Sequence, residues 1–166
     1  LNDVRNLEVA MRVAKREGGH VQATISYTLS PVHSNEGFAK MAKQLESMGA
    51  DSICIKDMAG LIAPYDAYDL VKRLKESTSL PIQLHCHYTS GMASMAYMKA
   101  AEAGVDVVDC AISSMSLGTS QPPTETIVAA MAQTPRATGL DLGKISTIGK
   151  YFAKIRKKYA HLEMNM

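Results

Sequence analysis

The chain has 166 residues, of which 46% are hydrophobic and 20% charged, which is enough for one domain with a sizeable core. Its net charge of +2 is too small to indicate binding to nucleic acid or to an anionic membrane surface. The three cysteines, Cys54, Cys86 and Cys110, show no CxxC spacing, so no disulfide framework is indicated and a reducing, cytoplasmic location is expected.

Helical and strand-like segments alternate along the chain. The first predicted helix covers residues 2–17 and ends at Gly18-Gly19. The predicted strand–helix units that follow are strand 21–28 with helix 35–48, strand 51–57 with helix 64–76, strand 81–87 with helix 91–103, and strand 106–110 with a helix that follows Pro122-Pro123 and ends near Gln133. A last amphipathic helix is predicted over residues 141–161.

The predicted strands repeat at the length of a strand–helix unit, which indicates a parallel sheet with right-handed crossovers. In an open doubly wound sheet the central strands are buried on both faces and should be almost wholly apolar. These strands instead carry polar residues on one face, which is typical of a (β/α)₈ barrel with a site at its C-terminal rim. Because a barrel needs eight strands and about 250 residues, we interpret residues 1–166 as a fragment: the C-terminal half of a barrel, with the first four strands absent.

The polar face of two predicted strands carries the most informative residues. Side chains alternate along a strand. Lys56 therefore lies on one face of its strand, while His85 and His87 share one face of the next. Burying such groups without partners is costly, and two imidazoles at positions i and i+2 can reach a single metal ion. An isolated HxH pair is a weak signal, but the lysine one unit earlier strengthens a metal interpretation.

Five sequence blocks resemble the biotin-dependent carboxyltransferase domain of oxaloacetate decarboxylase alpha subunits, pyruvate carboxylases and transcarboxylases. The similarity covers nearly the whole chain and is greatest to the oxaloacetate decarboxylase alpha subunit. The blocks are Leu1-Asn2-Asp3-Val4-Arg5-Asn6, Ser30-Pro31-Val32-His33, Lys56-Asp57-Met58-Ala59-Gly60, His85-Cys86-His87, and Ser113-Ser114-Met115-Ser116-Leu117-Gly118-Thr119-Ser120-Gln121-Pro122.

The resemblance implies a divalent metal at the C-terminal rim of the barrel, with zinc expected and manganese or cobalt as alternatives. Its ligands would be His85, His87 and a carboxylated Lys56, together with an aspartate from a segment that this chain lacks. Carboxylation would convert the lysine ammonium, which a cation repels, into an anionic oxygen ligand. Thr119 would contact biotin and carry a proton between it and the pyruvate enolate.

The implied reaction moves CO₂ from oxaloacetate to biotin and releases pyruvate. No biotin-carrier Met-Lys-Met motif is present, so a biotinylated carrier domain must supply the biotin. A homo-oligomer is expected and, for the decarboxylase branch, membrane partner subunits; nucleic acid is not expected as a partner. The missing aspartate puts the activity of the isolated chain in doubt.

Three alternatives stay open on the sequence alone. The chain could belong to the pyruvate carboxylase branch. It could be a metal-dependent aldol-type lyase or synthase of related fold, although those enzymes normally lack the lysine of Lys56-Asp57-Met58. It could also be a non-catalytic half-barrel that is stable only when paired, because four strands leave two open sheet edges.

Overall fold

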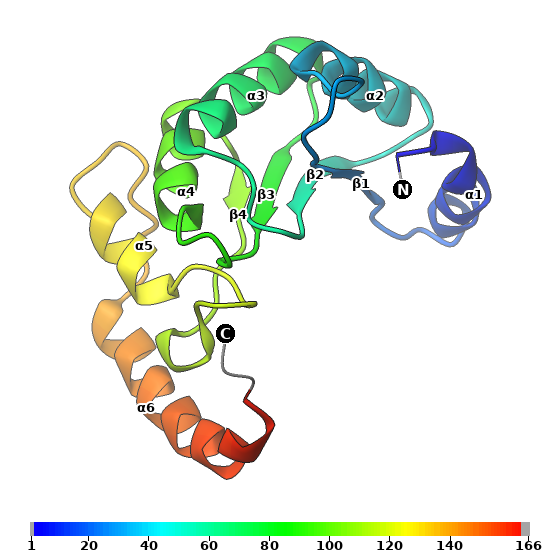
Figure 1. Ribbon diagram of the computed structural model, residues 1–166. Helices are drawn as coiled ribbons and strands as arrows, with labels where there is room; N and C mark the ends of the chain where they lie inside the picture. Colours follow the sequence, from blue (N-terminus) through cyan, green and yellow to red (C-terminus); the bar gives the residue numbers. More distant parts are fainter. Residues whose placement is uncertain (1, 164–166) are drawn as a thin grey trace.

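A four-stranded parallel sheet organises the fold in the computed structural model, which describes residues 2–163 (Figure 1). The strands are β1 (Gln22–Ser26), β2 (Ser52–Asp57), β3 (Ile82–Cys86) and β4 (Val107–Val108). They are hydrogen-bonded in chain order, and every neighbouring pair is parallel. The predicted order of the strands and their parallel direction are confirmed, as is the α/β class.

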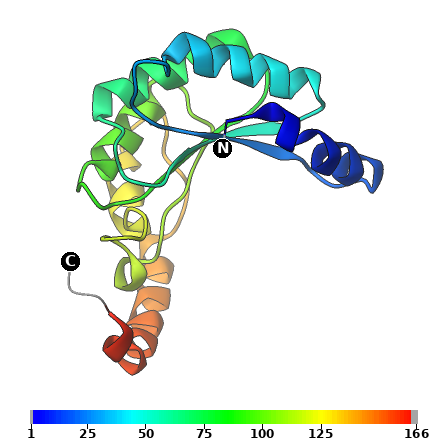
Figure 2. The same cartoon turned by 45° about the vertical axis from the view of Figure 1, so that its right-hand side comes forward.

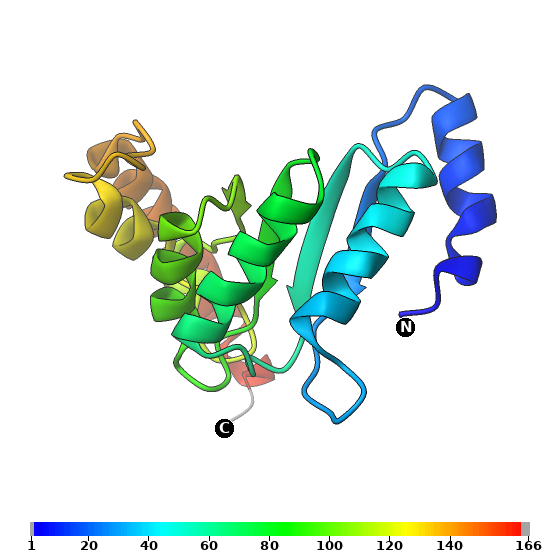
Figure 3. The same ribbon diagram turned by 90° about the horizontal axis from the view of Figure 1, so that it is seen from above.

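Among residues 2–163, the helices cover one face of this sheet. The helices are α1 (Glu8–Arg16), α2 (Asn35–Ser47), α3 (Pro64–Ser77), α4 (Ala93–Glu102), α5 (Thr124–Met131) and α6 (Leu142–Lys158), with 3₁₀ turns η1 (Val4–Asn6), η2 (Ser113–Met115) and η3 (Ala160–Leu162). Helices α2, α3 and α4 form an arch over the sheet, and its opposite, concave side is left open (Figure 2). Seen from above, these three helices lie side by side, with α1 beyond one end of the row and α5 and α6 beyond the other (Figure 3).

Local sequence signals explain where two of these helices begin and end. The Ser34 hydroxyl accepts a hydrogen bond from the backbone N–H of Gly37 and so caps α2. Gly49, with a φ of +95°, follows the end of that helix in a left-handed conformation that glycine adopts without strain. Pro64 is the first residue of α3, where its missing N–H costs nothing. The starts of α2 and α3 agree with the predicted helices over residues 35–48 and 64–76.

The hydrophobic core lies between the sheet and the arch of helices. Along β2, Ile53 and Ile55 are 0% and 1% exposed, and along β3 Leu84 is 0% exposed. They pack in one cluster with residues of α2, α3 and α4 such as Leu45 and Leu74. Burying an aliphatic side chain of this size contributes about 2 kcal/mol. The alternate residues of each strand face the concave side, as the period of two requires.

Several predicted elements, β4 and α6 among them, are shorter in the structure than the sequence indicated. Strand β4 has two ladder residues, Val107–Val108, instead of the predicted 106–110. The Asp109 side chain hydrogen-bonds residues of β3, and the chain then forms an isolated bridge between Ala111 and Pro123 instead of continuing the ladder. Helix α6 ends at Lys158, where Tyr159 leaves helical geometry with φ −109° and ψ 10°, and a 3₁₀ turn replaces its last residues.

The helix predicted over residues 2–17 is also divided. Asp3 caps the short turn η1, and α1 starts only at Glu8. Separately, none of the helices between residues 2 and 163 combines the length and the apolar character that a membrane crossing requires.

Candidate active site

The parallel register brings the predicted lysine and the first histidine together. Lys56 on β2 is the partner of His85 on β3. His87 follows the end of β3, and its backbone N–H donates to the carbonyl of Asp57 at 3.0 Å. Because positions 85 and 87 alternate with the buried Cys86, both histidines lie on the concave side together with Lys56. All three residues are half-buried at the carboxyl end of their strands.

The two imidazole rings face each other through the same nitrogen. Nε2 of His85 lies 3.4 Å from Nε2 of His87, and the ring planes meet at 70°. The other nitrogen of each ring has an oxygen acceptor: His85 Nδ1–H donates to Oδ2 of Asp109 at 2.7 Å, and His87 Nδ1–H donates to the backbone carbonyl of Thr119. A carboxylate and a carbonyl only accept, so in the neutral rings the proton sits on Nδ1 and each Nε2 presents a lone pair.

This arrangement fits a metal ion between the two rings. Two lone pairs facing each other repel unless a cation lies between them. Two nitrogens bound to one tetrahedral zinc, each about 2.05 Å from it, would be about 3.3 Å apart, close to the separation found here. Histidines that bind metal usually donate their other N–H to a carboxylate or a carbonyl, as His85 and His87 do.

Lys56 is the candidate for a further ligand from this chain. Within residues 2–163, no group of three or more His, Cys, Asp or Glu side chains is placed to hold a metal ion. A third ligand from the described residues would therefore be of another kind. Lys56, the register partner of His85, would provide an anionic oxygen if its amine were carboxylated.

Asp57 organises the loop that follows Lys56. Its side chain is fully buried, and its carboxylate accepts hydrogen bonds from the backbone N–H groups of Ile62 at 2.7 Å and of Ala59 at 3.2 Å. The thiol of Cys86 donates to the same carboxylate at 3.4 Å. This buried carboxylate thus holds the β2–α3 loop against the end of β3.

Gly60 brings the loops after β2 and β3 into direct contact. It has a φ of +64°, and a Cβ at this position would lie 2.7 Å from the carbonyl oxygen of His87 and from Oγ1 of Thr89. Thr89 also donates to the carbonyl of Ala59 at 2.7 Å, and Ser90 donates to the carbonyl of Gly60. Only glycine fits there, so the two loops that follow the strands of the candidate ligands are locked together.

Thr119 reaches the histidines through its backbone. Its carbonyl accepts from His87, whereas its side chain is exposed. The loop that carries it is anchored by Tyr88 N–H, which donates to the carbonyl of Ser120 at 2.8 Å, and it contains Leu117 at a φ of +72°. A cavity of about 390 Å³ adjoins this loop and is lined by Ser116, Leu117, Gly118, Thr119, Arg156, Leu162 and Glu163.

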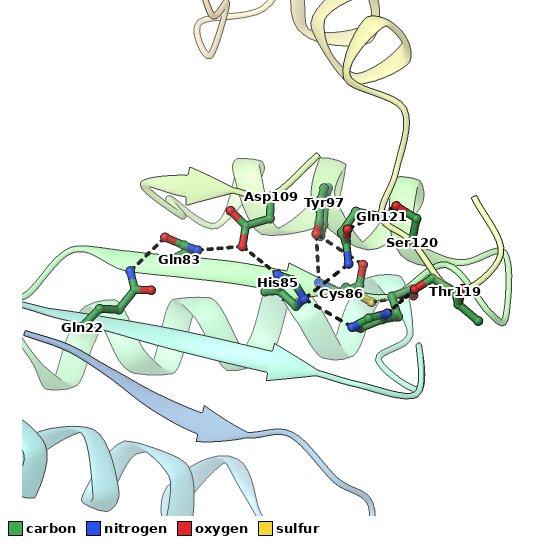
Figure 4. A network of polar contacts seen from close by, with 10 residues as sticks. Gln22, Gln83, His85, Cys86, Tyr97, Asp109, Thr119, Ser120 and Gln121 are labelled. Atoms are coloured by element: carbon green, nitrogen blue, oxygen red, sulfur yellow. Dashed lines mark hydrogen bonds and ion pairs between the residues drawn. The ribbon is translucent and has the colours of Figure 1, made fainter. Parts of the chain in front are cut away.

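Two residues near His85 were not predicted as site residues. Asp109 accepts from the ring of His85, and the side-chain amide of Gln121 lies 3.4 Å from Nε2 of the same ring (Figure 4). The available signal for Asp109 was its position directly after the apolar run of β4, where the strand reaches the same sheet edge as His87. Gln121 belongs to the block that carries Thr119 but has no distinguishing pattern of its own.

The cysteines do not show the properties of reactive thiols. Burial raises the pKa of Cys54 to about 11 and that of Cys110 to about 12, and burial together with the Asp57 charge raises the pKa of Cys86 further. Thiolates are the reactive form, so these groups are poor nucleophiles at neutral pH. A role as small apolar residues is consistent with this chemistry.

The sequence matches a known protein family over most of its length. The profile of the HMGL-like family covers residues 3–151. The chain is 59% identical over 162 residues to a pyruvate carboxylase subunit of Methanocaldococcus jannaschii, covering 98% of this chain and 29% of that protein. It is 49% identical over 165 residues to the methylmalonyl-CoA carboxyltransferase 5S subunit of Propionibacterium freudenreichii subsp. shermanii, covering 98% of this chain and 33% of that protein.

The fold matches solved structures of carboxyl transferase domains. The domain of Rhizobium etli pyruvate carboxylase solved with pyruvate and biocytin superposes with a TM-score of 0.98 at 40% identity, covering 100% of this chain and 29% of that chain. The same domain solved with pyruvate alone gives the same values. The present chain thus spans about a third or less of the length of these relatives.

Proposed function

The chain belongs to the HMGL-like family, and from this we propose that it forms part of the active site of a biotin-dependent carboxyltransferase that acts on pyruvate or oxaloacetate. The observation that carries the proposal is the facing His85–His87 pair beside Lys56, at the carboxyl end of a parallel sheet. The similarity to a carboxyl transferase domain solved with pyruvate and biocytin supports the substrate class. Residues 1–166 would then be a partial carboxyltransferase domain.

The direction of the reaction separates two branches. From oxaloacetate, the bond to the carboxyl group breaks, its electron pair stays on the substrate as the pyruvate enolate, and the carboxyl group passes to N1 of biotin. Pyruvate carboxylation is the reverse. The sequence pattern favoured the oxaloacetate decarboxylase branch, whereas two of the matched relatives are named as pyruvate carboxylases, at 59% and 56% identity. We therefore favour pyruvate carboxylation as the reaction of the complete protein. Oxaloacetate decarboxylation, the reverse reaction, is the alternative.

The chain's own residues divide the work between binding and proton transfer. His85, His87 and carboxylated Lys56 would hold a divalent metal, with zinc favoured over manganese or cobalt. When bound, such an ion polarises the keto oxygen of the substrate and stabilises developing negative charge. Asp109 and the Thr119 carbonyl keep both rings in the tautomer that can bind it. In the carboxylation direction the Thr119 hydroxyl takes a proton from the methyl carbon of pyruvate and gives one to N1 of biotin as the carboxyl group leaves it; decarboxylation reverses both transfers.

The partners follow from this chemistry. A biotinylated carrier domain would deliver biotin to the concave side, where the backbone of the exposed Thr119 contacts His87. The complete protein would be a homo-oligomer, joined by membrane subunits only if it belongs to the decarboxylase branch. The cytoplasm is the compartment that we propose.

The proposal is tested with the complete protein that contains this chain. We expect pyruvate formation from oxaloacetate to be stimulated by free biotin and to be lost on treatment with a metal chelator. His85→Ala should abolish the stimulation, while His161→Ala, which changes an exposed histidine of η3 far along the chain, should not. Biotin-independent activity, or stimulation that survives in His85→Ala, would overturn the proposal.

A further inference from the structure

We propose that Gln83 and Gln22 are positioning residues for the metal site and that they act through Asp109 on the tautomer of His85. The inference rests on the proposed function, because it concerns the same histidine pair. It goes further in assigning a role to two amides that lie outside the expected ligand set, on the part of the concave face away from the strands' carboxyl ends (Figure 4).

The hydrogen bonds form one directed chain from β1 to the histidine. Gln22 Nε2 donates to Oε1 of Gln83 at 2.9 Å. Gln83 Nε2 donates to Oδ2 of Asp109 at 2.7 Å. That same carboxylate oxygen accepts from Nδ1 of His85 at 2.7 Å. The series ends at a carboxylate, which can only accept hydrogen bonds. The Gln83 amide must therefore turn its nitrogen toward Asp109 and its oxygen toward Gln22.

The amides of Gln22 and Gln83 can meet across the sheet because the strand between them, β2, carries small side chains at the facing positions. Gln22 and Gln83 are on β1 and β3, with β2 between them, and their register partners on β2 are Ser52 and Cys54. These side chains are short enough to leave the two longer amides in contact above them. The Ser52 hydroxyl also lies 3.4 Å from the amide nitrogen of Gln22. A larger residue at either position would separate the amides.

The role of these hydrogen bonds is to fix the rotamer of Asp109 and the position of the proton on the His85 ring. The backbone N–H of Asp109 donates to the carbonyl of Leu84 on β3 at 3.1 Å, which places the main chain but does not fix the rotamer of the Asp109 side chain. The bond from Gln83 restrains its carboxylate, and Gln22 prevents the Gln83 amide from turning its oxygen toward that carboxylate. With Asp109 held, His85 keeps its proton on Nδ1 and presents the lone pair of Nε2 to His87.

The test measures Co²⁺ affinity in the complete protein, by competition with a chelator. We expect Asp109→Ala to weaken binding by about 10–100-fold, as is usual for partners of a metal-binding histidine. Gln83→Met, which keeps the length of the side chain but removes the donor, should weaken binding about fivefold, the effect of one typical hydrogen bond. Gln44→Met, the same substitution at an exposed position of α2, should change nothing.

A double substitution separates action through Asp109 from an independent effect. If Gln83 acts through Asp109, Gln83→Met combined with Asp109→Ala should bind Co²⁺ no more weakly than Asp109→Ala alone. ¹⁵N NMR of the metal-free protein should show His85 protonated on Nδ1 in wild type and a mixture of tautomers in Gln83→Met. Loss of a purely structural tie between β3 and β4 would not change the tautomer. Gln83→Glu places a second carboxylate against Asp109 and should weaken Co²⁺ binding at least as much as Gln83→Met. It replaces Gln83→Met in the test if that variant does not fold.

The outcomes distinguish this inference from the proposed function. Unchanged affinity and tautomer in the Gln83 variants, or additive losses in the double variant, would overturn the role of the amide chain and leave the metal site standing. A wild-type protein that binds no Co²⁺, or one whose Co²⁺ binding survives His85→Ala, would overturn both.

Discussion

Lys56 and His85 are register partners on adjacent parallel strands, so the lysine lies beside one of the two facing imidazoles. Side chains at paired positions on one face of a sheet are immediate neighbours. An ammonium group there would repel a bound cation, whereas a carboxylated amine would attract it. The chemical state of Lys56 therefore decides whether the histidine pair has a third ligand from this chain.

Replacing either histidine should remove the metal. His85→Ala or His87→Ala takes away one of few protein ligands, so most of the bound metal should be lost. Elemental analysis of the purified complete protein measures this, and His33→Ala, which changes a histidine near the start of α2, is the matched control. Full metal content in both variants would refute the assignment of the ligands.

Lys56 should carry CO₂ in the wild-type protein. We expect a carbamate ¹³C signal after incubation with labelled bicarbonate, and its absence in Lys56→Met. Removing CO₂ and bicarbonate should weaken metal binding by the wild type and have no effect on Lys56→Met, which already lacks this ligand. Lys144→Met, an exposed lysine of α6, should behave as wild type. A carbamate signal that persists in Lys56→Met would place the modification elsewhere.

Thr119→Ala should impair proton transfer without disturbing the metal. The hydroxyl is exposed, and the contact with His87 is made by the backbone carbonyl, which the substitution keeps. We expect biotin-stimulated pyruvate formation to fall by about 100-fold, as for a positioned proton carrier, with metal content unchanged. Thr119→Ser should retain more activity because it keeps the hydroxyl. Equal rates in wild type and Thr119→Ala would leave the residue with only its backbone role.

Asp57→Ala should destabilise the fold. The substitution leaves the backbone N–H groups of Ile62 and Ala59 without their acceptor in a buried place. The expected loss is about 3 kcal/mol of unfolding free energy, measured by urea denaturation. Asp57→Asn keeps an acceptor oxygen and should lose less. If both variants were as stable as the wild type, the loop would not depend on this carboxylate.

The cysteines should be protected in the folded state. Because burial raises the pKa of Cys54 to about 11, little thiolate exists at pH 8 and a disulfide reagent should react slowly until denaturant is added. The folded protein keeps the Cys54 proton up to a higher pH than the unfolded chain does, because the pKa of the thiol has its ordinary value of about 9 when the chain is unfolded. Stability should therefore fall as the pH rises from about 9 to 11. Rapid labelling of Cys54 at pH 8 in native protein would contradict this.

The sheet and its polar face were predictable because they depend on local periodicity. Ile53 and Ile55 alternate with Cys54 and Lys56, and a period of two fixes which residues share a face. The length of β4 was not predictable, because after Asp109 the chain turns to an isolated bridge between Ala111 and Pro123, a contact that no local pattern indicates.

The sequence indicated the candidate ligands but not the groups that hold them in place. The HxH spacing and Lys56 are visible in the sequence. The acceptor of His87 is a backbone carbonyl, that of Thr119, and any residue type can supply one, so no residue pattern reveals it. The Gln22–Gln83 contact depends on two small residues of the strand between them, and nothing in either amide's own neighbourhood indicates it.

Gly60 sets a limit on how the site can move. The carbonyl oxygen of His87 occupies the space where a side chain at position 60 would begin, so backbone presses on backbone with no flexible group between them to absorb a displacement. A shift of the β3–α4 loop is therefore passed directly to the segment that follows Lys56. The lysine and the two histidines should move as one rigid unit, and the spacing of a metal's ligands would be preserved even while the rim around them changes shape.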